Sequence, residues 1–193
     1  MHLSLEHLTT DFLPEIVALD RACFGKLWST EQYQREFDSP NSDILTLLRV
    51  DSREILAYGC VWEIVDEAHI TIVAVHPAQR QQGFGKLMLW GLLQAAIIRQ
   101  LARATLEVRA TNTTAIQLYE QFGFETAGRR KKYYADTGED ALILWKGGLR
   151  NSTCHKQLTA VRQNLYQKFQ QQSFDLIVSL DTAGNTEIGS AAS

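Results

Sequence analysis

The residues with the clearest chemical potential form a short glycine-rich segment, Arg80-Gln81-Gln82-Gly83-Phe84-Gly85. A run rich in β-branched residues at 70–75 predicts a strand before it, which ends at His76-Pro77 because proline cannot donate to a sheet ladder. An apolar run at 87–101 predicts a helix after it. Such a turn directs the unpaired N–H groups at the helix start toward an anion. The segment therefore predicts a phosphate-binding loop.

Two common nucleotide-binding loops do not fit this segment. A P-loop has Ser or Thr after its Gly-Lys pair, whereas Leu87 follows Gly85-Lys86 in this chain. A Rossmann fingerprint has a third glycine three residues after the second, where this chain has Met88. A plain strand-to-helix turn without a ligand also fits these few residues, so the segment alone leaves both interpretations open.

A carboxylate and a phenol further along the chain have the chemistry to move protons. Glu107 lies in a predicted strand at 105–109, and Tyr119 lies in a predicted helix at 113–122. A glutamate on a half-buried strand usually faces solvent, and a tyrosine on a short helix usually packs on the core. Asn112, between the two elements, also fits an ordinary turn. Pattern alone therefore assigns no reaction to these side chains.

The remaining elements follow from hydrophobic periodicity and turn residues. Strands are predicted at 3–8, 44–50 and 55–64, and two more flank Tyr133-Tyr134. Helices are predicted at 11–23 and from Trp28-Ser29 onward, where Ser29 and Gln32 fit a capping box. This mixture of strands and helices in 193 residues predicts one domain of the α/β (α+β) class.

Composition narrows the possible partners. The net charge of −3 gives no basic signature for nucleic-acid binding, and no apolar stretch approaches the ~20 residues of a membrane span. The first residues lack the layout of a signal peptide. Cys23, Cys60 and Cys154 show no paired metal spacing, and His69 and His76 are isolated residues expected at the surface or in turns. We therefore expect a cytoplasmic protein without a metal, a membrane contact or direct nucleic-acid binding.

Three blocks of sequence occur in the order and spacing of one enzyme family. The glycine loop is the first, the second is ATLEVRATNTTAIQLYEQFGF at 104–124, and the third is GRRKKYY at 128–134 with EDALILW at 139–145. Together they resemble the GNAT superfamily of N-acetyltransferases, and within it the bacterial ribosomal-protein-alanine N-acetyltransferases (RimI type). The resemblance runs from about residue 3 to residue 146.

This resemblance implies a fold, a reaction and a set of site residues. The implied fold is a mixed, mostly antiparallel sheet of six to seven strands flanked by about four helices. The implied reaction is direct transfer from acetyl-CoA to the N-terminal α-amine of a protein, with the N-terminal alanine of a ribosomal protein (S18-like) as expected substrate. Glu107 is implied as general base and Tyr119 as general acid. The hairpin around Tyr133-Tyr134 resembles the substrate hairpin of the family, and we expect Trp28 and Tyr134 to form the wall of the peptide slot. The implied cosubstrate-binding residues are Val73, Ala74, Val75, Gln81, Gln82, Gly83, Phe84, Gly85, Lys86 and Asn112.

Other roles remain open on sequence alone. The acceptor can also be a lysine side chain or a small amine, and the chain can be a coenzyme A-binding module without catalysis. The presence of both Glu107 and Tyr119 favours an enzyme, which we expect to be a monomer or a weak dimer.

Residues 147–193 lie beyond the resemblance, so we divide the chain into an acetyltransferase domain at 1–146 and a C-terminal extension. Apolar residues at helical spacing predict an amphipathic helix at 158–174. The small and polar composition of 181–193 predicts disorder. Since the extension lies outside the predicted sheet, we expect it to be dispensable for folding and for acetyl-CoA binding.

Overall fold

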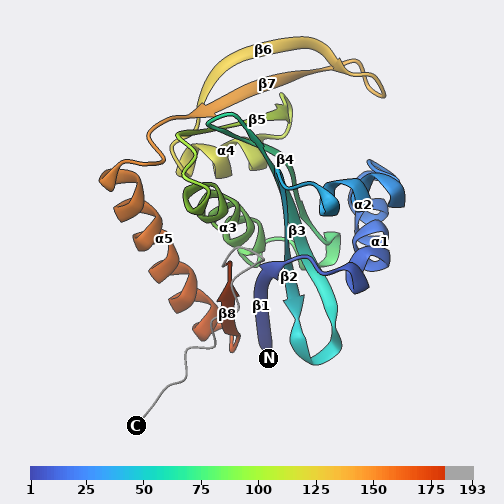
Figure 1. Ribbon diagram of the computed structural model, residues 1–193, viewed down its shortest axis with the longest axis vertical. Coiled ribbons are helices and arrows are strands. Elements are labelled where there is room, and N and C mark those ends of the chain that lie inside the picture. The colour runs from blue at the N-terminus through green and yellow to red at the C-terminus, as the bar shows by residue number, and fades with distance from the viewer. Residues whose placement is uncertain (181–193) are drawn as a thin grey trace.

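An eight-stranded sheet forms the centre of the computed structural model, which describes residues 1–180 (Figure 1). The strand order is β6-β7-β5-β4-β3-β2-β1-β8. Only the pairs β4–β5 and β1–β8 are parallel. The mixed, mostly antiparallel sheet is therefore confirmed, with eight strands instead of six to seven. The strands are β1 His2–His7, β2 Ser42–Arg49, β3 Glu54–Ile64, β4 Glu67–Val75, β5 Arg103–Arg109, β6 Glu125–Tyr134, β7 Glu139–Lys146 and β8 Asp175–Ser179.

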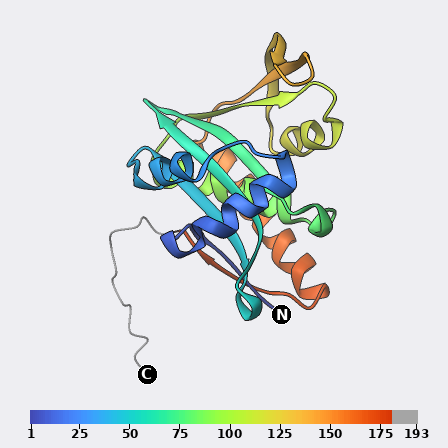
Figure 2. The ribbon, with the colours of Figure 1, turned by 90° about the vertical axis from the view of Figure 1, so that its right-hand side faces the viewer.

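Helices cover both faces of the sheet. Helices α1 and α2 lie on one face, and α3 and α5 lie on the other (Figures 1 and 2). Ser29 and Gln32 form the predicted capping box at the start of α2. None of the described helices is long and apolar enough to cross a membrane. The helices are α1 Leu13–Phe24, α2 Thr30–Asp38, α3 Phe84–Ile98, α4 Thr113–Gln121 and α5 Ser152–Gln171, with short 3-10 turns at Thr10–Phe12, Val50–Ser52 and Pro77–Gln79.

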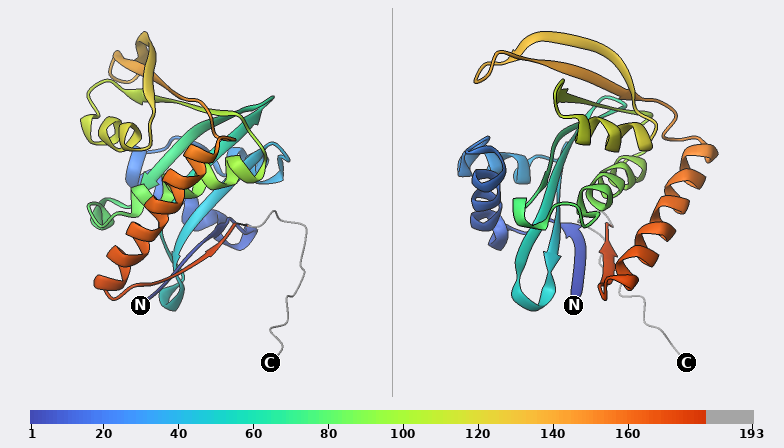
Figure 3. Two further views of the ribbon diagram at one scale, coloured as in Figure 1. Left: turned by 90° about the vertical axis from the view of Figure 1, so that its left-hand side faces the viewer. Right: turned by 180° about the vertical axis from the view of Figure 1, so that it is seen from behind.

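The C-terminal extension is part of the core, so the expectation that it lies outside the sheet is wrong. Strand β8 pairs with β1 along its whole length, and α5 runs beside α3 (Figure 3). Leu158, Leu165 and Phe169 of α5 are buried, as is Leu176 of β8. The physical reason lies in α3, which is apolar around most of its circumference and so needs cover on the side away from the sheet. Residues 181–193, for which the sequence predicts disorder, lie outside the described residues.

The parallel strands β4 and β5 separate near the middle of the sheet. Their pairing runs from Glu67↔Arg103 to Ile70↔Leu106 and then stops. Strand β4 nevertheless continues to Val75 alongside β3, and β5 continues alongside β7. The hairpin of β6 and β7 lies beyond β5, at the end of the molecule opposite the N-terminus (Figure 2). The separation leaves edge backbone groups on β4 without a strand partner on the β5 side, next to the glycine-rich loop.

Candidate active site

The glycine-rich loop joins the end of β4 to the start of α3. Gln81 has a φ of 65° and Gly83 a φ of 100°, so the chain turns sharply before the helix. Gly83 is the N-cap of α3, and within residues 1–180 no side chain caps this helix start. The N–H groups of its first turn therefore lack an intrahelical acceptor. A Cβ on Gly85 would meet Val75 and Leu118 side chains at 3.6 and 3.7 Å, which is ordinary contact. The loop thus presents its backbone beside the end of β4.

Glu107 lies on β5, just beyond the last residue paired with β4. Leu106 and Val108 are buried in the apolar cluster that contains α3, so Glu107 points to the opposite face of the sheet. Its carboxylate oxygens lie 3.3 Å from Nε2 of His69 and 3.3 Å from a guanidinium nitrogen of Arg130. Its side chain is only 14% exposed. Glu107 is therefore a partly buried carboxylate held between an imidazole and a guanidinium, not a side chain that extends freely into solvent.

Tyr119 lies on α4, which follows β5. Asn112 caps this helix, since its side-chain oxygen accepts from the backbone N–H of Ala115 at 3.2 Å. The Tyr119 ring is 8% exposed and packs edge-on against Phe124, with 5.9 Å between ring centroids. Burial, together with the nearby Tyr134, raises the pKa of Tyr119 above its ordinary value. The phenol therefore keeps its proton at neutral pH.

Tyr134 connects the surroundings of Glu107 and Tyr119. It ends β6, and the guanidinium of Arg109 lies over its ring, 3.9 Å from the centroid. Arg109 is fixed in turn by a hydrogen bond of 2.8 Å to Asp136. Burial raises the pKa of Tyr134, the Arg109 charge opposes that shift, and the Glu107 charge adds to it. Tyr134 thus lies close enough to Glu107 and Tyr119 to interact electrostatically with both.

Trp28 is held in place by a buried carboxylate. Asp20 accepts from the backbone N–H of Trp28 at 3.1 Å, from that of the preceding residue at 2.6 Å, and from the hydroxyl of Tyr33 at 2.6 Å. The Trp28 ring stacks nearly parallel on Trp62, with 6.3 Å between centroids. Trp62 is 6.0 Å from the ring of His69. A row of rings therefore leads from the loop after α1 to the imidazole beside Glu107.

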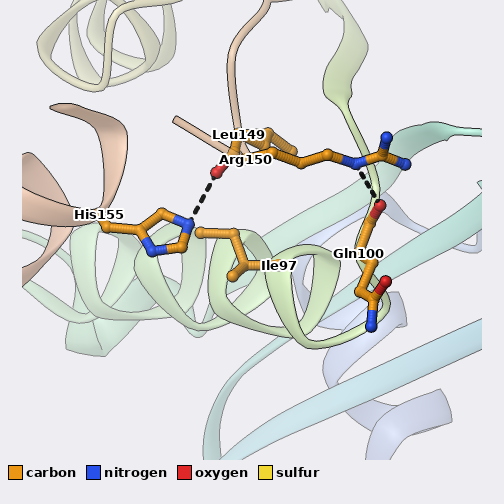
Figure 4. A pocket seen from close by; sticks show the side chains of 5 residues that line it. All are labelled: Ile97, Gln100, Leu149, Arg150 and His155. Carbon is orange, nitrogen blue, oxygen red and sulfur yellow. Dashed lines mark hydrogen bonds between the residues drawn. The ribbon is translucent and has the colours of Figure 1, made fainter. Parts of the chain in front are cut away.

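A hollow lies away from these residues, between the end of α3 and the start of α5 (Figure 4). Its polar groups bond to the chain itself: Arg150 donates to the carbonyl of Gln100 at 2.7 Å, and the His155 ring lies 3.0 Å from the carbonyl of Leu149. Within the described residues no group of three or more His, Cys, Asp or Glu could hold a metal ion. The candidate active site lies instead at the gap between β4 and β5, where Glu107 follows the last residue paired with β4.

Several residues of this site are absent from the sequence-based set. His69 and Thr105 face each other across the parallel pair, with Nδ1 of His69 3.1 Å from the Thr105 hydroxyl. The expectation that His69 is an isolated surface or turn residue is therefore wrong, because the strand register places it beside Glu107. Arg130 reaches Glu107 from β6 in the same way. A charged turn followed by two tyrosines is the only sequence signal for Arg130, and nothing in the sequence pairs His69 with Glu107.

Comparison with known proteins gives the same family as the sequence blocks. The model of the acetyltransferase (GNAT) family matches residues 13–124. The ribosomal protein bS18-alanine N-acetyltransferase of Escherichia coli (strain K12) is 30% identical over 143 residues, which are 73% of this chain and 95% of that protein. The enzyme of the same name from Salmonella typhimurium is 31% identical over 139 residues, 71% of this chain and 92% of that protein.

Solved structures share the fold. The crystal structure of the ribosomal-protein-S18-alanine N-acetyltransferase from Escherichia coli superimposes with a TM-score of 0.68 at 29% identity, covering 75% of this chain and 93% of that one. Ard1 from Thermoplasma volcanium, at 17% identity, has the same fold with a TM-score of 0.66, covering 76% and 97%. The chain therefore belongs to the acetyltransferase (GNAT) family.

Proposed function

We propose that this acetyltransferase moves the acetyl group of acetyl-CoA directly to the N-terminal α-amine of a protein. Its proposed substrate is the N-terminal alanine of a ribosomal protein related to bS18. The observation that carries the proposal is the position of Glu107 at the point where β4 and β5 separate, from which β4 runs on toward an uncapped glycine loop. Relatives that match over nearly their whole length are named for this reaction, which supports the same acceptor here.

The gap and the loop fit acetyl-CoA. The N–H of His76 donates to the carbonyl of Leu56 on β3 at 2.9 Å. Since backbone groups alternate along a strand, those of Ala74 also point to β3, whereas those of Val73 and Val75 point into the gap. Such edge groups would pair with the amides of the pantetheine arm as an added strand does. The diphosphate would be held at the start of α3 by the loop residues Gln81, Gln82 and Gly83 and by the first-turn residues Phe84, Gly85 and Lys86, with Asn112 beside the arm.

Glu107 acts as the general base on the acceptor amine. Its carboxylate takes a proton from the amine directly or through a water molecule, and His69 and Arg130 keep the carboxylate at the gap. An N-terminal α-amine has a reference pKa of ~7.7–8.0, against ~10.4 for lysine. A carboxylate base is therefore sufficient for an α-amine near neutral pH, and less so for a lysine side chain.

Tyr119 acts as the general acid. As the amine nitrogen bonds to the acetyl carbon, the bond from that carbon to sulfur breaks, and Tyr119 donates its proton to the departing thiolate. The buried phenol stays protonated at neutral pH because its pKa is raised. Trp28 and Tyr134 form walls of the slot for the peptide, and Asp20 and Arg109 fix their positions. The protein would meet this substrate in the cytoplasm, where we expect it as a monomer or a weak dimer.

Two matched peptides test the choice of acceptor. One carries a free N-terminal alanine and no lysine, and the other has that amine blocked and one lysine free. We expect the first to be acetylated at least tenfold faster at pH 7.5, because its amine is far more often neutral. Mass spectrometry of timed samples with acetyl-CoA measures both rates. Equal rates would exclude the N-terminal assignment in favour of lysine or small amines, and no transfer to either peptide would favour a coenzyme A-binding module.

A further inference from the structure

Lys168, on the C-terminal helix α5, lies against the glycine-rich loop. Its Nζ is 3.1 Å from the position that a Cβ on Gly83 would take, and its Cε and Cδ are 3.5 and 3.6 Å away. The end of this long side chain therefore runs along the N-cap of α3, although the two residues are far apart in the sequence. No block of sequence shared with the family includes Lys168.

The packing around Phe169 fixes the position of Lys168. Phe169 is completely buried, and its ring lies 5.8 Å from that of Phe84, the first residue of α3. Phe174 closes the cluster, at 5.8 Å from Phe84 and 6.1 Å from Phe169. A second contact joins α3 and α5 nearer the N-terminus of α5, where the indole N–H of Trp90 donates to the carbonyl of Leu158 at 3.0 Å. The backbone of Lys168 is therefore held by a rigid contact with the first turn of α3.

Two other basic side chains near the loop form hydrogen bonds within the protein, whereas Lys168 forms no salt bridge among the described residues. Arg80 donates to the carbonyl of Val75 at 3.4 Å, and Lys86 donates to the side chain of Gln121 at 3.3 Å. Among the salt bridges within residues 1–180, none involves Lys168. The ammonium thus stands beside a helix start whose N–H groups also attract negative charge.

We propose that Lys168 binds the diphosphate of acetyl-CoA together with the first-turn N–H groups of α3. This inference rests on the proposed function, because it takes the loop as the diphosphate site. The ammonium adds a full positive charge to the partial charge of the helix start, and hydrogen bonds between charged partners are stronger than neutral ones. The C-terminal extension then has two roles: it covers α3, and it supplies a ligand-binding residue from outside the sequence shared with the family.

Calorimetric titration of the full chain with coenzyme A tests this role. Lys168→Met keeps an apolar stem of similar length and removes the charge, so we expect its Kd to rise roughly tenfold, the effect of losing about 1.4 kcal/mol. Lys168→Arg should restore most of the affinity. Lys156→Met, at an exposed position on the same helix, is the matched control and should bind like wild type. The Kd of Lys168→Met should also depend less steeply on salt concentration, which loss of packing alone would not produce.

Each possible outcome is decisive. Dephospho-coenzyme A lacks the 3′-phosphate, so a diphosphate contact predicts the same tenfold loss with this probe. A loss seen with coenzyme A and absent with dephospho-coenzyme A would overturn the diphosphate assignment. Wild-type affinity in a folded Lys168→Met variant would overturn the inference and leave the proposed function intact. Failure of the wild-type protein to bind coenzyme A would overturn both.

Discussion

Replacing Tyr119 by phenylalanine is expected to lower the turnover number on the order of 10²-fold or more, with little change in acetyl-CoA affinity. The variant keeps the ring that packs on Phe124 and removes only the proton donor. Steady-state rates on a peptide with a free N-terminal alanine, together with calorimetric affinities, measure the two effects separately. Since the pKa of Tyr119 is raised, its ionisation should cause no loss of wild-type rate below about pH 10.

The variant Glu107→Gln tests the general base in the same assay. It preserves the size of the side chain and removes the base, so turnover should fall at pH 7 and recover in part as pH rises through the range where the α-amine loses its proton. Tyr119→Phe should show no such recovery, because its defect lies in the departure of the thiolate. Full activity of both variants would show that neither side chain moves a proton in the reaction.

Phe169→Ala is expected to lower the free energy of unfolding by about 3–5 kcal/mol, the usual cost of removing a fully buried aromatic ring. The same packing predicts that a chain ending at Arg150 will be insoluble or will melt far below the full chain, because Phe84 and Trp90 lose their cover. Chemical denaturation of the full-length variant and thermal melting of the shortened chain provide these two measurements.

Gln170→Ala is the matched control for the aromatic cluster, since this neighbour of Phe169 is exposed on the same helix. It should change stability by less than about 0.5 kcal/mol. A shortened chain that folds with wild-type stability and binds acetyl-CoA would show that α5 and β8 are dispensable. That result would agree with the expectation from sequence and contradict the packing described here.

Patterns within short segments predicted most of the fold. The strand at 70–75, the glycine turn and the helix after it were recognisable because periodicity and glycine placement act over a few residues. The capping box at Ser29 is equally local and is confirmed. The extension was misjudged for the opposite reason: β8 is set by pairing with β1 at the other end of the chain, and a five-residue strand carries little signal of its own.

In the candidate site, too, residues within local sequence patterns could be predicted, and residues placed by long-range contacts could not. Glu107 and Tyr119 could be identified because they lie inside a continuous block of sequence that resembles a known family. His69 could not, since its contact with Glu107 depends on the register between two parallel strands separated by a helix. Phe84, at the start of α3, packs against Phe169 and Phe174, which lie more than 80 residues further along the chain, so its role was not visible in the sequence.

The most direct test of the central claim is calorimetric titration of acetyl-CoA into the wild-type protein, Gly85→Ala and Gly85→Trp. A Cβ at Gly85 makes only ordinary contacts and the residue has no left-handed φ, so all three chains should fold, as circular dichroism and thermal melting would verify. We predict micromolar or tighter binding by the wild type, weaker binding by Gly85→Ala, and no measurable binding by Gly85→Trp, whose indole fills the space where the loop backbone meets the diphosphate. Unchanged affinity in a folded Gly85→Trp variant would contradict the account.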